Sequence, residues 1–243
     1  FDLAKTIGFP LILKPDEGVG ADRIYKVADS IQLNEILAGL EGDYFMEAFI
    51  GAPIVTYDGL VDYDGRLLFE NSLTYGEGVL EYVQGKDTFF YVERHIPEAV
   101  GDIGRQLVRA FGIRRKFFHF EFFFLDGSYL PIEINCRPPG GAILDMMNYS
   151  ADVDLYAAYA RMITGKGQAA MAEDKQYYCA YAGRRDRTYR YTHEELNHLL
   201  GPALVEFGEN PAIFKQAMCR YRYIIRSASR EKLLGMVRDV QRI

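Results

Sequence analysis

Acidic, amide and guanidinium side chains at alternate positions of an apolar run are the residues best suited to chemistry. In IEINCRPPGG (132–141), Glu133, Asn135 and Arg137 would share one face of a strand, because successive strand side chains point to opposite faces. The preceding apolar run carries Glu121, and a tight turn at Asp126-Gly127 would bring it alongside that set. Mg²⁺ usually takes one or two carboxylates completed by phosphates and water, and an adjacent arginine can fork onto a phosphate. The pattern therefore favours a metal-phosphate site over a sheet face that is merely polar.

His119 lies two residues before Glu121 and would share its strand face. Three interpretations stay open: a residue that orients a metal ligand, a contact to substrate, and an ordinary sheet histidine. The role of Asp145, the one acid in the apolar run 142–148, is also open. Four phenylalanines would back the site on the opposite face of the same strand: Phe118, Phe120, Phe122 and Phe124.

The composition predicts a globular, sheet-rich protein that holds such a strand pair. The chain has 243 residues, is 49% hydrophobic, and contains eighteen tyrosines, sixteen phenylalanines and no tryptophan. A formal charge of −6 argues against a nucleic-acid partner. No apolar run approaches the roughly 20 residues that span a bilayer, and no secretory signal is visible. Three cysteines without metal-type spacing fit a reduced, cytoplasmic protein.

Hydrophobic periodicity predicts both strands and helices around the site. The chain begins as if inside a helix that ends at Gly8, so we expect an upstream segment, and the polar stretch 166–174 predicts a subdomain boundary. Strands are expected at 9–14, 23–27, 44–50, 53–61, 66–75, 89–92, 177–181, 203–207 and 219–226. Helices are expected at 29–40, 97–111, 153–163, 193–200 and 230–242, with Asp152 as the N-cap of the third.

Two further segments carry weaker signals for a nucleotide. Lys14 ends the apolar run FPLILK and is followed by a loop with Gly18 and Gly20, which resembles a phosphate-binding turn as well as an ordinary hairpin loop. Glu47 stands inside the apolar strand YFMEAFI, either facing water at a sheet edge or beside an adenine. A third polar group, the arginines from Arg184 to Arg190, could bind an anion, but the acidic net charge favours a solvated loop.

Four stretches together resemble the ATP-grasp superfamily, in particular its carboxylate–amine ligase branch, which is related to amino-acid ligases, carbamoyl-phosphate synthase and biotin carboxylase. They are GFPLILKPDEGVGADRIYKV (8–27), FMEAFIGAP (45–53), FHFEFFFLDGSYLPIEINCRPPGG (118–141) and CRYRYIIRSASREKLLGMVRDV (219–240). The resemblance covers nearly the whole chain, and the third stretch is its most specific part.

The resemblance implies an α+β fold with mainly antiparallel sheets. Residues 1–50 would form a small subdomain and residues 51–165 a large one, with ATP between them, and residues 166–243 a C-terminal α/β subdomain. The N-terminal domain that usually precedes them would be missing. Implied cofactors are ATP and Mg²⁺ or Mn²⁺, and implied partners are small-molecule carboxylate and amine substrates, without nucleic acid or membrane. A homodimer would be ordinary for this fold.

The resemblance also implies roles for individual residues. Lys14 would contact the ATP phosphates under Gly18 and Gly20, and Arg137 would stabilise the transferred phosphoryl group, with Glu133 also catalytic. The adenine would lie against Met46, Glu47, Ala48 and Ile50. Glu121, Glu133 and Asn135 would hold the metal, and Gly140, Gly141 and His119 would meet the substrate.

The sequence departs from the family at three points. Pro53 stands where many relatives have an acid that binds ribose, the glycine loop has no serine beside it, and we expect the usual upstream domain to be missing from the sequence given. Besides a ligase that forms an acyl phosphate, two functions therefore stay open. One is an enzyme that phosphorylates bicarbonate, and the other is an ATP-binding module without catalysis.

Overall fold

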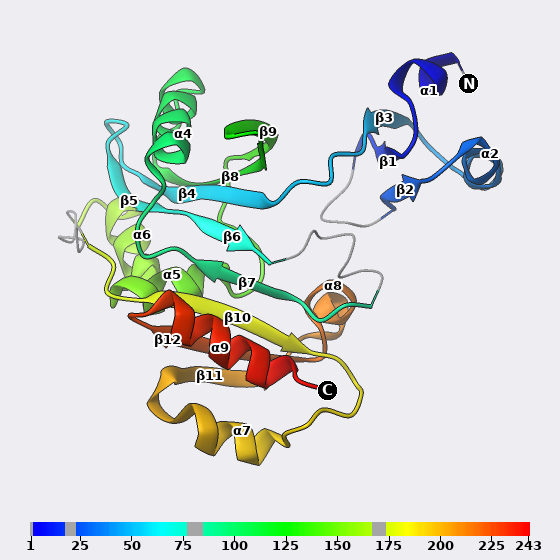
Figure 1. Cartoon of the computed structure of the whole chain (residues 1–243). Helices are drawn as coiled ribbons and strands as arrows, with labels where there is room; N and C mark the ends of the chain where they lie inside the picture. The colour runs from blue at the N-terminus through cyan, green and yellow to red at the C-terminus, as the bar shows by residue number, and fades with distance from the viewer. Residues whose placement is uncertain (1, 18–22, 77–84, 167–173) are drawn as a thin grey trace.

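The computed structural model describes residues 2–17, 23–76, 85–166 and 174–243, arranged as two sheets with helices packed on them (Figure 1). No helix in these ranges is long and apolar enough to cross a membrane. The smaller sheet has three antiparallel strands in the order β2-β1-β3. Its elements are α1 (Asp2–Ile7), β1 (Leu11–Pro15), β2 (Tyr25–Val27), α2 (Ser30–Ala38) and β3 (Tyr44–Ala48).

The larger sheet has nine strands in the order β11-β12-β10-β7-β6-β4-β8-β9, with β5 paired to β4. Its pairings are antiparallel, so the predicted α+β class with mainly antiparallel sheets is confirmed. Because β7 pairs with β10, the sheet continues through the expected boundary near residue 166. The strands are β4 (Ile54–Val61), β5 (Leu67–Asn71), β6 (Leu73–Tyr75), β7 (Phe89–Val92), β8 (Lys116–Leu125), β9 (Ser128–Asn135), β10 (Tyr178–Arg184), β11 (Leu204–Glu209) and β12 (Tyr221–Ser227).

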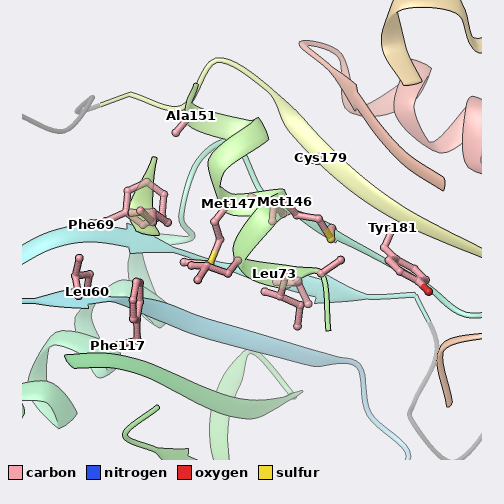
Figure 2. Packing of buried hydrophobic residues seen from close by; sticks show 14 of the residues in the cluster. Leu60, Phe69, Leu73, Phe117, Met146, Met147, Ala151, Cys179 and Tyr181 are labelled. Atoms are coloured by element: carbon pink, nitrogen blue, oxygen red, sulfur yellow. The ribbon is translucent and has the colours of Figure 1, made fainter. Parts of the chain in front are cut away.

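Helices cover both faces of the larger sheet. On one face, α5 (Ile143–Ala151) and α6 (Leu155–Ile163) bury a core in which Met146 and Met147 pack over strand residues such as Phe69 and Phe117 (Figure 2). The opposite face carries α4 (Glu98–Ala110), α7 (His193–Leu200) and α9 (Arg230–Gln241). The short α8 (Lys215–Met218) and two 3₁₀ turns, Gly201–Ala203 and Ala212–Phe214, complete the described elements.

The predicted central hairpin forms as β8 and β9. Its turn is at Asp126 and Gly127, whose backbones both have positive φ, as a tight hairpin turn requires. Phe118, Phe120 and Phe122 lie on the face toward α4, as the alternation predicts. The opposite face of β8 therefore carries the polar residues of the candidate site.

Two local predictions are wrong. The stretch 66–75 is expected to be one strand, but it is broken at Ser72 into β5 and β6, which pair with different parts of β4. Asp152 is expected to cap α6, yet Asp154 does so by accepting the Ala157 N–H at 2.9 Å. Asp152 instead ends α5 in a left-handed conformation and pairs with Arg226.

Candidate functional site

Two carboxylates face each other across the central hairpin. Glu121 on β8 is directly opposite Glu133 on β9, and the neighbouring pair is His119 opposite Asn135. A bulge follows immediately after Glu121, a feature that often re-aims side chains beside functional sites. Like charges directly opposite on neighbouring strands are destabilising. Glu133 is exposed and has no ion pair or hydrogen bond within the described residues. The pair is therefore suited to share a cation.

His119 lies buried between Glu121 and a second acid, Asp58 on β4. Its Nδ1 is 2.5 Å from Asp58 Oδ1, and its Nε2 is 2.9 Å from Glu121 Oε1. The antiparallel register of β4 and β8 places Asp58 opposite His119 and Thr56 opposite Glu121. Thr56 Oγ1 donates to Asp58 Oδ2 at 2.5 Å. Both ring nitrogens of His119 are thus engaged by carboxylates.

The charge state of His119 follows from these neighbours. Burial has the largest influence and lowers its pKa, but attraction to Asp58 and hydrogen bonds to Asp58 and Glu121 together raise the pKa to about 10. At neutral pH the ring is therefore an imidazolium that donates from both nitrogens. It holds Glu121 Oε1 and leaves the other oxygen of that carboxylate for a different partner.

The buried polar chain continues from Asp58 to Lys175. Asn71 Nδ2 donates to Asp58 Oδ2 at 3.2 Å, and Lys175 Nζ donates to Asn71 Oδ1 at 2.9 Å. Asp58 and Asn71 are fully buried, and Lys175 is 6% exposed. Burial lowers the pKa of Lys175 to about 7, against the attraction of Asp58, Glu93 and Glu70.

The residues predicted to bind metal have the donor types that Mg²⁺ prefers. Asn135 is on the same strand face as Glu133, and its Nδ2 is buried without a hydrogen-bond partner in the described structure. Mg²⁺ would bind the amide oxygen of Asn135, and the unpartnered NH₂ group is suited to donate to an anion such as a phosphate oxygen. Within the described ranges, no three His, Cys, Asp or Glu side chains form a metal cluster. Two carboxylates and an amide nevertheless fit an ion whose remaining ligands are phosphate oxygens and water.

The loop after β9 offers groups for an anion. Arg137 is exposed, and its Nη1 donates to its neighbour's carbonyl oxygen, Pro138 O, at 3.0 Å. Gly141 has φ +60, a left-handed conformation that favours glycine. Helix α5 then begins without a side-chain hydrogen bond to its first N–H groups. The Ile143 N–H group donates to Gly140 O at 3.4 Å, and the N–H groups that follow it, together with the helix dipole, favour a bound anion at this end of the loop.

The residues predicted to bind nucleotide are on the smaller sheet. Lys14 and Glu47 form an ion pair across β1 and β3, and Lys14 is also over the Phe45 ring at 5.6 Å from its centroid. Met46, by contrast, packs partly into the core of this unit, Ala48 pairs with Leu11, and Ile50 follows β3. Gly18 and Gly20 lie outside the described residues.

The predicted solvated loop of arginines is confirmed only in part, because Arg187 and Arg190 are exposed whereas Arg184 is buried. Arg184 is 2% exposed, and it donates to Val240 O at 2.5 Å and Tyr191 O at 2.8 Å. Arg185 donates to Lys86 O at 2.9 Å, while Arg187 pairs with Asp87. A cavity of about 310 Å³ adjoins the cluster. Through Lys86 and Asp87, Arg185 and Arg187 connect the segment before β7 to the loop that follows β10.

The sequence reasoning missed Thr56, Asp58, Asn71 and Lys175. A signal for two of them was present, because Thr56 and Asp58 are polar residues at alternate positions of the apolar strand PIVTYDGLV. No local pattern marks Asn71 or Lys175, which reach the site only through tertiary contacts.

No family model and no curated protein matches the sequence. Solved structures do match, including L-amino acid ligase from Bacillus licheniformis (TM-score 0.72, 15% identity, covering 96% of this chain and 62% of that one). Carboxyaminoimidazole ribonucleotide synthase from Aspergillus clavatus, complexed with ATP, matches with a TM-score of 0.72 and 13% identity over 98% of this chain and 63% of that one.

The biotin carboxylase domain of 2-oxoglutarate carboxylase from Hydrogenobacter thermophilus, in complex with MgADP, ADP and bicarbonate, matches with a TM-score of 0.69 and 16% identity. That match covers 98% of this chain and 58% of the other. The chain thus spans about three fifths of the length of these structures. Similarity over nearly the whole chain shows that it shares the fold of these structures, the ATP-grasp fold.

Proposed function

We propose that the chain is the ATP-binding and metal-binding part of a ligase that activates a carboxylate as an acyl phosphate for attack by an amine. The observation that carries the proposal is the Glu121–Glu133 pair on neighbouring strands, with Asn135 beside it, on an ATP-grasp fold. Residues 1–50 and 51–165 would grip the nucleotide from two sides, and residues 166–243 would form the C-terminal subdomain.

The reaction has two steps. A carboxylate oxygen attacks the γ-phosphorus of ATP, the bond to the β–γ bridging oxygen breaks, and ADP leaves. The amine then attacks the carbonyl carbon of the acyl phosphate, and inorganic phosphate leaves with its electron pair while the nitrogen loses a proton. Neither step needs a nucleophile from the protein, so the protein contributes position and charge.

Each group of this chain has a role in that chemistry. The Arg137 guanidinium would bind the transferred phosphoryl group with its forked donors. Free N–H groups at the start of α5 and the backbone at Gly140 and Gly141 would bind the substrate carboxylate. Lys14 would exchange its ion pair with Glu47 for a contact to the ATP phosphates, which frees Glu47 for the adenine amino group.

Mg²⁺ fits the oxygen donors of Glu121, Glu133 and Asn135, where it would neutralise phosphate charge as the phosphoryl group moves. The local charge supports this assignment. Asp58, Glu121 and Glu133 bring three carboxylates to one sheet face, against the His119 imidazolium and Lys175. A bound cation would offset this excess of negative over positive side-chain charge.

The test is a screen of the full chain for ADP release with paired acids and amines at saturating ATP. We expect ADP release that requires Mg²⁺ and a carboxylate, with amide formation when the matching amine is added. Tight ATP binding by calorimetry without turnover across the panel would instead show a binding module.

A bicarbonate-phosphorylating enzyme is the second candidate. It is supported by the biotin carboxylase domain, whose TM-score of 0.69 is close to the 0.72 of the amino acid ligase. ADP release stimulated by bicarbonate in the absence of any organic acid would favour it. ADP release that is insensitive to bicarbonate and depends on an organic acid would reject it.

A further inference from the structure

We propose that Lys175, Asn71 and Asp58 are positioning residues that hold Glu121 in the orientation in which it binds the metal ion. This inference rests on the proposed function above. It assigns a role to three buried residues on β4, on β5 and in the segment before β10, none of which touches the substrate in the proposed chemistry.

The direction of each hydrogen bond in the chain is determined by the chemistry of its two ends. Lys175 Nζ donates to Asn71 Oδ1, so the Asn71 amide has its oxygen toward Lys175. The Asn71 NH₂ group then faces Asp58, whose carboxylate can only accept. The Nδ1 and Nε2 atoms of His119 lie within hydrogen-bond distance of Asp58 and Glu121, respectively. This single orientation of the Asn71 amide gives Lys175 and Asp58 each a hydrogen-bond partner, and Asp58 in turn contacts His119 beside Glu121.

The Lys175 end of this hydrogen-bonded network is anchored. At Lys175, Arg94 Nε donates to the backbone carbonyl oxygen at 3.1 Å. The next two backbone N–H groups, at Gln176 and Tyr177, both donate to Ser150 O on α5 at 3.0 Å. These contacts place the lysine amine independently of the hairpin. The network therefore connects Glu121 to helix α5 as well as to its own strand.

Loss of the lysine donor would release this arrangement step by step. Without Lys175, the Asn71 amide has no donor for its oxygen and can rotate, so that Asp58 loses its NH₂ partner. Asp58 would then hold His119 less firmly, and the Glu121 carboxylate, held less firmly at Oε1, would no longer be fixed with its other oxygen toward the metal. Residues that orient metal ligands typically change metal affinity by about 10-fold to 100-fold when replaced. Lys175 acts on Glu121 through three intermediates, Asn71, Asp58 and His119, so we expect the metal affinity to change about three- to tenfold.

The experiment measures Mn²⁺ binding to the full chain in the presence of saturating ADP, by electron paramagnetic resonance of free Mn²⁺. We compare the wild type with Lys175→Met and with Lys232→Met, a control on an exposed part of α9. We expect the Kd for Mn²⁺ to rise about three- to tenfold in Lys175→Met only. The Kd for ADP without metal should change less than about twofold in either variant.

Thr56→Val is a second, nearly isosteric variant, which removes one donor to Asp58 without disturbing Lys175. Thr56→Val should also weaken Mn²⁺ binding. It replaces Lys175→Met as the test variant if circular dichroism shows that Lys175→Met is unfolded. A folded Lys175→Met or Thr56→Val protein with wild-type Mn²⁺ affinity would overturn the positioning role alone. A wild-type chain that binds no Mn²⁺ with ADP would overturn the proposed metal site and this inference together.

Discussion

Replacement of Lys175 by methionine should change how the stability of the protein depends on pH. Burial lowers the pKa of Lys175 to about 7, from 10.5 when unfolded. Between these values the unfolded chain binds more protons than the folded one, so this lysine makes stability rise with pH. The slope approaches about 1.4 kcal/mol per pH unit. Asp58, Glu93 and Glu70 are the charged groups that face the amine and oppose the shift.

His119 has the opposite effect on stability. Its pKa is about 10 in the folded state and 6.5 when unfolded, so the folded chain binds more protons between those values. Its contribution is fully present below pH 6.5 and is lost as pH rises through about 10. In the wild type the slopes from His119 and Lys175 oppose each other between about pH 7 and about pH 10. In Lys175→Met only the falling slope remains.

The expected change in unfolding free energy follows from the pH range in which both Lys175 and His119 contribute. From about pH 7.5 to about pH 9.5, Lys175→Met should lose about 2 kcal/mol of unfolding free energy relative to the wild type. Urea denaturation followed by far-ultraviolet circular dichroism measures this difference, since the chain has no tryptophan. The unfolding free energy of Lys232→Met should depend on pH in the same way as that of the wild type. A difference between wild type and Lys175→Met that is flat across this range would refute the assignment of a buried, proton-releasing lysine.

Three further substitutions test separate features. Gly104→Ala would place a Cβ 2.0 Å from the Tyr57 ring, and urea denaturation should show a loss of about 1–3 kcal/mol. Its control, Gly235→Ala, has no atom closer than 3.8 Å to the new Cβ and should be neutral or slightly stabilising. Asp58→Asn removes the buried anion beside His119, and urea denaturation at neutral pH should show that the free energy of unfolding falls by about 3 kcal/mol. Lys14→Met should weaken ATP binding about tenfold by calorimetry, and unchanged ATP affinity would remove Lys14 from the phosphate site.

Much of the hairpin could be predicted because its determinants are local. Period-two alternation and the Asp126-Gly127 turn together determine which side chains share a face and which strand residues meet. For the same reason the amino-acid pattern alone suffices to place Glu121 and Glu133 on one wall of the sheet. The break at Ser72 follows the polar residues Glu70 and Asn71, but no glycine or proline marks a turn there, and the pairing with β4 divides the two strands.

The network behind Glu121 could not be predicted, because its members come from four separate segments. Asp58 meets His119 through the pairing of β4 with β8, and Asn71 meets Asp58 through the pairing of β4 with β5. Lys175 arrives from the segment before β10. Arg184 illustrates the same limit, because charge composition predicts exposure, whereas carbonyl oxygens and tyrosine rings enclose its guanidinium.

The central claim is that Glu133 and Glu121 bind the metal ion that serves phosphoryl transfer from ATP. The measurement that tests it most directly is Mg²⁺-dependent ADP release by Glu133→Gln, with the acid and amine identified in the screen. Gln keeps the size of the side chain and removes its charge, and Glu231→Gln on α9 provides an exposed control. We expect turnover to fall by at least about 100-fold, the scale for loss of a group that stabilises transition-state charge. Turnover of Glu133→Gln within about twofold of the wild type would contradict the claim.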